Sequence, residues 1–226
     1  MRRSPWVPRL VLGAGGIALL GAIIAIAVGE GGSEEIELTG AGQTQQLIGG
    51  ILQEGALLGS DDAPVVMTVF NDLQAPSGQD FELDVVDPLI EEFVRTGDMR
   101  VEIRHFSFTE RETNLAAYAA TSAGEQDRQW QYLDLFFRNQ DEAHGVVTQE
   151  FLRDIANAVP ELDTDQWSDD IDSEAVHDTV ETDAALGDQL RLPAAPAVEV
   201  TGPGGNQSLD DSPSLDEVRA AIESVS

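Results

Sequence analysis

Cysteine and lysine are both absent from this sequence of 226 residues. Without cysteine the chain can form no disulfide, bind no metal through thiolates and carry no lipid on a cysteine. All twelve basic residues are therefore arginines, against 42 acidic residues, and the formal net charge is −30. Such a surface repels nucleic acid, so we expect no nucleic-acid partner. A saline habitat and an arginine-biased proteome are both compatible with this composition.

Charged residues are also missing from a long apolar run near the N-terminus, residues 10–28. A helix over this run would be about 28 Å long at ~1.5 Å per residue, close to the thickness of a bilayer's hydrocarbon core. Residues 1–9 carry arginine and acids follow the run, so the positive-inside rule predicts a cell-membrane anchor with residues 1–9 in the cytoplasm and the domain outside. Secretion after signal cleavage near residues 25–27 is the alternative. Residues 29–46 are typical of a flexible linker.

The next apolar stretch predicts a strand–helix–strand unit. Val65 to Asn71 is a continuous apolar run with β-branched residues, as expected of a buried strand. From Gln79 apolar residues recur at helical spacing, and Pro88 should kink that helix. Residues 99–106 alternate between apolar and polar and indicate a second strand, parallel to the first.

The remainder predicts helices, a hairpin and a closing helix. Ala197 to Thr201 should form a third strand, and Gln207 to Leu209 could pair back on it as a fourth. Ser214 begins an amphipathic helix with Glu217 at the capping-box position. Apolar spacing of three and four predicts helices in four further segments: 112–124, 127–140, 148–158 and 173–190.

Three stretches resemble, in the right order, the DsbA-like branch of the thioredoxin superfamily. They are Leu58–Gln74, then Ala75-Pro76-Ser77-Gly78 followed by Phe81, and Leu192–Val198. The match covers about residues 47–225. It implies an α/β, thioredoxin-like fold with a central mixed sheet of four or so strands and an all-helical subdomain inserted at about residues 107–192.

The resemblance also implies where a site would lie. DsbA-like proteins carry their two redox cysteines where this chain has Ala75 and Gly78, so neither a nucleophile nor a resolving thiol is present. The family's cis-proline corresponds to Pro196, and the residue before it, Ala195, would pair with an extended peptide. The expected peptide-binding residues are therefore Ser77, Ala195 and Pro196, beside the remnant motif Ala75, Pro76, Ser77 and Gly78. The alternative is that these residues only preserve the fold.

Other chemistry has weaker support in the sequence. Ser77 at a helix start could be a nucleophile with His105 as its base, but a helix-start serine is more often a cap. The acidic run at 169–174 lacks the spacing of a calcium loop and is typical of a helix boundary. The aromatic residues between Trp130 and Phe137 have the spacing of a helical core. We expect no cofactor and no metal site.

These observations leave three functional hypotheses. The first is a redox-inactive, membrane-tethered domain that binds an extracytoplasmic polypeptide as a holdase or assembly partner. The second is a thiol–disulfide oxidoreductase whose thiols come from a partner chain. The third is a structural component of the envelope. The absence of cysteine favours a protein that is not an enzyme.

Overall fold

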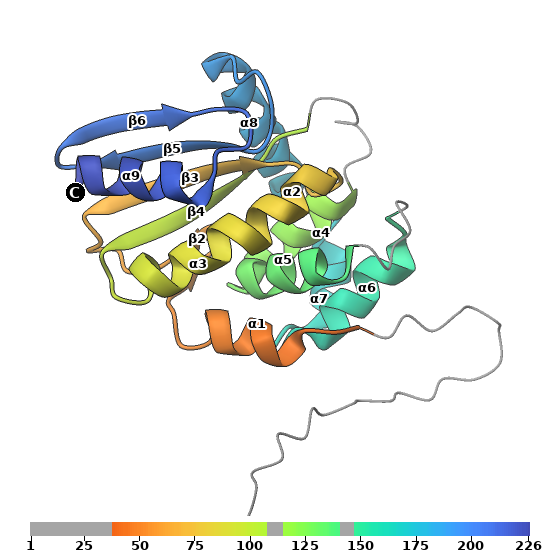
Figure 1. The fold of residues 1–226 in the computed structure, drawn as a ribbon. Helices are drawn as coiled ribbons and strands as arrows, with labels where there is room; N and C mark the ends of the chain where they lie inside the picture. The colour runs from red at the N-terminus through yellow and green to blue at the C-terminus, as the bar shows by residue number, and fades with distance from the viewer. Residues whose placement is uncertain (1–37, 108–114, 141–146) are drawn as a thin grey trace, which may run out of the picture. The chain divides into compact units, whose positions relative to one another are not determined.

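The structure is a computed structural model that describes residues 38–107, 115–140 and 147–226 (Figure 1). The anchor or signal expected at residues 10–28 lies outside these ranges, as do residues 1–9 and the first part of the expected linker. Among the helices of the described ranges, none has both the length and the apolar character needed to cross a bilayer.

A mixed sheet forms the centre of the domain. Its strands lie in the order β1-β2-β4-β3-β5-β6, and β3 runs parallel to β4 while the other neighbours are antiparallel. The predicted parallel pair and the hairpin are confirmed, whereas β1 and β2 are too short for periodicity to reveal. The strands are β1 (Gln53–Glu54), β2 (Leu57–Leu58), β3 (Val65–Asn71), β4 (Met99–His105), β5 (Ala197–Gly202) and β6 (Gly205–Leu209).

A long helical stretch follows β3 and lies across one face of the sheet beside α9 (Figure 1). It consists of α2 (Pro76–Phe81), the π-helical turn η1 (Glu82–Val86), α3 (Asp87–Leu89) and a second π-helical turn, η2 (Ile90–Val94). Pro88 lies within α3, and the helix continues through it with a wide turn on either side. Proline has no backbone N–H to donate, and the wider π-helical turns allow the helix to continue without that hydrogen bond. Pro88 therefore does not end the helix.

The predicted helical insertion is confirmed. Its aromatic residues form the expected core, because Trp130, Tyr132, Phe136 and Phe137 are all fully buried. Helix α7 was not predicted as a separate helix, since Trp167 is its one buried residue and gives no periodicity. The insertion consists of α4 (Leu115–Gly124), α5 (Gln129–Arg138), α6 (Gln149–Ala158), α7 (Thr164–Asp170) and α8 (Glu174–Leu190).

Helix α1 (Ala41–Ile48) overlaps the end of the segment expected to be a flexible linker. Three residues on one side of it, Thr44, Leu47 and Ile48, are buried, which is the spacing of a docked helix. Asn139 accepts a hydrogen bond from the Thr39 amide at 2.7 Å and donates one to the Thr39 carbonyl at 3.0 Å. The linker prediction is therefore too long at its C-terminal end.

The chain ends in helix α9 (Leu215–Val225), which packs on β5 and on the sheet face that carries the main core. Ser214 caps this helix, and Glu217 completes a capping box, as predicted from the spacing of the two residues.

Candidate functional site

The four residues expected to correspond to the redox motif, Ala75 to Gly78, lie at the start of α2, shortly after β3. Ala75 is the extended N-cap residue and Pro76 occupies the first helical position, where its missing N–H costs nothing. Pro76 and Ser77 are exposed and Ala75 is half-buried, whereas Gly78 is buried. The side chains of Pro76 and Ser77 therefore face solvent, whereas Gly78 faces the interior.

Gly78 has no room for a side chain. A Cβ atom built on it would lie 2.3 Å from the backbone oxygen of Asp72 and 2.6 Å from Oδ1 of Asn71. Both obstacles are held in place, because the Asp72 oxygen accepts a bond from the Ala75 amide at 3.2 Å and Asn71 Oδ1 accepts one from the Asp72 amide at 2.9 Å. Asn71 Nδ2 also donates to the Gly78 carbonyl at 3.2 Å. Position 78 therefore has no room for a Cβ atom unless the backbone moves.

The second part of the site is the loop that leads into β5. The Ala195–Pro196 peptide bond is cis. The register of β3 and β5 pairs Phe70 with Ala197, so this loop meets the same end of the sheet as the residues after β3. Pro196 is buried, and its carbonyl accepts a bond from the Ser212 amide at 3.0 Å.

Ala195 in this loop is half-buried, and its backbone is available for hydrogen bonding. Within the described residues, neither its N–H nor its C=O has a hydrogen-bond partner. Ala195 also packs against a small apolar cluster that is separate from the main core. This cluster consists of Phe70, Phe106, Leu192 and Ala197, with Leu186 and Ala195 partly buried against it.

The structure does not bring the candidate base to Ser77. His105 ends β4 and is buried, and its Nε2 lies 2.9 Å from Nε2 of Gln129. Burial lowers the pKa of His105, so the ring is held neutral. His177 stacks on Tyr118 with ring centroids 4.3 Å apart. Neither of these two histidines hydrogen-bonds to Ser77, and His144 lies outside the described residues. The serine-nucleophile hypothesis gains no support.

A buried cluster of carboxylates and one arginine lies between η1–α3 and α5. It was not predicted from the sequence. Arg138 donates to Asp87 Oδ2 at 2.5 Å and to both oxygens of Asp134, at 2.9 and 2.7 Å. Thr44 from α1 also donates to Asp134. Glu82, one turn beyond Gly78, is 1% exposed, and within the described residues its carboxylate makes no hydrogen bond of normal geometry, although the Asn71 side chain lies close enough to act on its pKa.

One guanidinium cannot neutralise three carboxylates. Burial, with the charges of Asp87 and Asp134, raises the pKa of Glu82 well above its usual value. Burial and the charge of Asp134 raise the pKa of Asp87 to about 8. Glu82 and Asp87 therefore take up a proton at higher pH than free carboxyl groups do. A sequence signal did exist, because Glu82 and Asp134 each interrupt an apolar helical run.

A shallow pocket of about 220 Å³ lies between β4 and α8, lined by Arg104, Asp178, Thr179 and Thr182. Arg104 is ion-paired with Glu102 and, at 2.8 Å, with Asp183, so its charge is already balanced. The acidic run at 169–174 spans the α7–α8 boundary, as predicted. In the described ranges, no group of three or more acidic or histidine side chains is arranged to hold a metal ion.

Comparison with known proteins assigns the family. The thioredoxin family model matches residues 52–224. The chain belongs to the thioredoxin family. Its relatives are DsbA-like, in agreement with the resemblance seen in the motifs. The residues expected to correspond to the redox and cis-proline positions thus lie at one end of a thioredoxin-like sheet.

Individual relatives are disulfide-forming proteins by name. The probable disulfide bond formation protein D of Bacillus cereus is 28% identical over 170 residues, covering 74% of this chain and 76% of that protein. Disulfide bond formation protein D of Bacillus subtilis is 26% identical over 170 residues, covering 74% and 75%.

Solved structures agree in fold. Oxidised BdbD from Bacillus subtilis has a TM-score of 0.65 at 24% identity and covers 76% of this chain and 96% of its own. The α-DsbA1 of Wolbachia pipientis has a TM-score of 0.63 at 20% identity, covering 80% and 94%.

Proposed function

We propose that this domain is a redox-inactive, DsbA-like module that binds extended polypeptide outside the cytoplasm, tethered to the membrane through residues 10–28. The observation that carries the proposal is the free backbone of Ala195 beside a motif without thiols. An extended chain laid along Ala195 would satisfy its N–H and C=O, as in other cases of strand addition.

The surroundings of Ala195 support this role. Leu186 and Ala195 are only partly buried against the small apolar cluster, so they can contribute apolar contact to a bound chain. Pro76 and Ser77 are exposed at the start of α2, and in this proposal they would form the opposite rim of the site. Backbone pairing with little side-chain discrimination suits a holdase or an assembly partner that meets unfolded chains.

The relatives' names concern disulfide formation, and that activity needs a thiolate. Thiols supplied by a partner remain the enzymatic alternative. The closure of the backbone around Gly78 weighs against it, because a site kept for thiol chemistry would retain room at the resolving position. A purely structural envelope role is the third hypothesis, and it predicts that changes at Ser77 or Ala195 have no effect.

The test is binding to an unfolded basic protein, prepared by reduction and alkylation of its cysteines with a neutral reagent. We expect the wild-type domain to bind it and two variants to bind at least about fivefold more weakly. Ser77→Trp obstructs the rim from an exposed position, and Ala195→Glu places a charge in the proposed site. The matched control is Ala220→Glu on the exposed side of α9, which adds the same charge away from the site.

Far-ultraviolet circular dichroism of each variant verifies that the fold is retained. Absence of binding by the wild-type domain contradicts the proposal. Equal binding by all variants also contradicts it, since polypeptide would then be held on another surface.

A further inference from the structure

Among the strands of the described residues, β6 forms one edge of the sheet and is paired on one side only, with β5 (Figure 1). It runs from Gly205 to Leu209, and all of its residues are exposed except Leu209, which is half-buried. The sequence of this strand, Gly-Asn-Gln-Ser-Leu, contains neither proline nor a charged residue. Proteins usually protect an exposed edge with such residues, because unpaired backbone groups pair readily with other chains.

The hairpin register shows which backbone groups point outward. Gly202 pairs with Gly205 across a two-residue turn, so these two residues exchange hydrogen bonds. Alternation along the ladder then directs the N–H and C=O groups of Asn206 and Ser208 away from β5. None of these four groups has a hydrogen-bond partner within the described residues.

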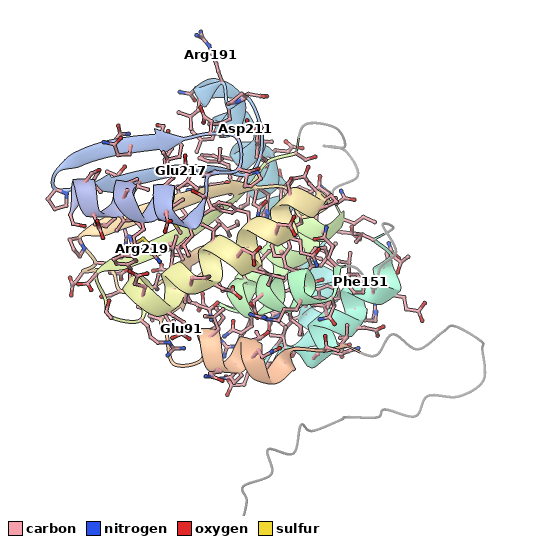
Figure 2. The ribbon with its side chains drawn as sticks, in the orientation of Figure 1. Glu91, Phe151, Arg191, Asp211, Glu217 and Arg219 are labelled. Atoms are coloured by element: carbon pink, nitrogen blue, oxygen red, sulfur yellow. The ribbon has the colours of Figure 1, made fainter. Side chains whose placement is uncertain are left out.

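Charge around this edge has one sign. The segment from Ala197 to Val218 contains no basic residue. The next arginine, Arg219, is ion-paired with Glu92 at 3.0 Å and Asp216 at 2.8 Å. In Figure 2, Arg191 points outward from the end of α8. The acidic residues of the segment are Glu199, Asp210, Asp211, Asp216 and Glu217.

Glu199 lies on the same face of the hairpin as Ser208. It is paired with Ser208 across the hairpin, and the Ser208 hydroxyl lies 3.5 Å from Oε1 of Glu199. An added strand would place the residue opposite Ser208 on this same face, within reach of Glu199 for a long side chain. Alternate residues of that strand would lie on the other face, beside Leu209, which packs against the core under α9.

We propose that the edge of β6 accepts an extended polypeptide segment whose residues alternate between basic and apolar. The backbone of this segment would pair with Asn206 and Ser208, its basic side chains would face Glu199, and its apolar side chains would lie beside Leu209. This surface is separate from Ala195, and the inference does not depend on the proposed function.

The probe is a six-residue peptide that alternates arginine and valine, with blocked ends and a fluorophore. Fluorescence anisotropy at 0.15 M salt measures its affinity for the intact domain. The decisive pair of variants is Ser208→Pro and Ser208→Ala, because proline removes the outward N–H while alanine keeps it. Proline is compatible with an edge position, so the hairpin should survive.

We expect Ser208→Pro to weaken binding at least about fivefold, the effect of one lost hydrogen bond. Ser208→Ala should bind like wild type, and Glu199→Gln should reduce the preference over a glutamate–valine peptide. Equal binding by the proline and alanine variants would overturn the proposal, since attraction to a negative surface does not require the N–H.

A second measurement keeps the proposal testable if Ser208→Pro unfolds the hairpin. The arginine–valine peptide is methylated on alternate backbone nitrogens, which preserves its charge but blocks strand pairing. A loss of at least about fivefold in affinity for the Ala195→Glu domain, in which pairing at Ala195 is obstructed, supports pairing at the β6 edge. An unchanged affinity overturns it.

Discussion

The substitution Gly78→Ala tests whether the backbone around Gly78 leaves no room for a side chain. The added Cβ would lie 2.3 Å from the Asp72 carbonyl oxygen and 2.6 Å from Asn71 Oδ1, so backbone must move. Overpacking of this kind costs about 1–3 kcal/mol, and the upper half of that range applies because the obstacles are hydrogen-bonded. Alanine in place of glycine returns up to about 1 kcal/mol through helix propensity. The net expected loss is about 1–2 kcal/mol of unfolding free energy.

Urea denaturation measures this loss, and a loss of that size lowers the melting temperature by roughly 2–8 °C in a domain of this length. Gly42→Ala is the matched control, since Gly42 lies in helix α1 and a Cβ there meets nothing within 4 Å. We expect Gly42→Ala to be at least as stable as wild type. If Gly78→Ala is also as stable as wild type, position 78 has room for a Cβ atom, which would contradict the clash described here.

Three further outcomes follow from the contacts around the site. The raised pKa values of Asp87, about 8, and Glu82 mean that the fold prefers their protonated forms. That contribution to stability is complete below about pH 4 and is lost as the pH rises through the pKa values of the folded state, so the unfolding free energy should fall from pH 5 to 9. The fall should be less steep in Glu82→Gln, and an equally steep fall in both proteins would contradict this prediction. Asn139→Ala removes the three hydrogen bonds to Thr39 and should increase amide exchange in α1 at least about fivefold, while unchanged exchange would mean that the other contacts of α1 are enough to hold it. Ala75→Cys should react with a thiol reagent faster than a cysteine at exposed Ala220, because a helix N-terminus favours the thiolate, and an equal rate would contradict that effect.

Most of the fold was predictable because its signals are local. The continuous apolar run of β3 and the alternation of β4 each occupy one short stretch of sequence, and the Ser214 capping box is a short-range motif. The missed elements lack such signals. Strands β1 and β2 have two residues each, and α7 buries a single tryptophan, so neither strand nor helix periodicity can appear.

The candidate site was predictable only in part, because some of its features follow from short sequence motifs and others from contacts between segments that are distant in sequence. Positions 75–78 and 195–196 follow from motif order along the chain. The carboxylate cluster joins Thr44, Glu82, Asp87, Asp134 and Arg138. These residues come from three separate segments, α1, η1–α3 and α5, and meet only when those segments pack together. The blocked space at Gly78 likewise depends on the path of the backbone at Asp72, which composition does not reveal.

The most direct test of the central claim is photocrosslinking in intact cells with a photoreactive residue at Ser77. The matched control carries the same residue at exposed Ala220 on α9. We expect polypeptide adducts from position 77 that are absent from position 220, and their loss when Ala195→Glu is added. Adducts from both positions alike, or from position 220 alone, would contradict the claim that the former redox site binds polypeptide.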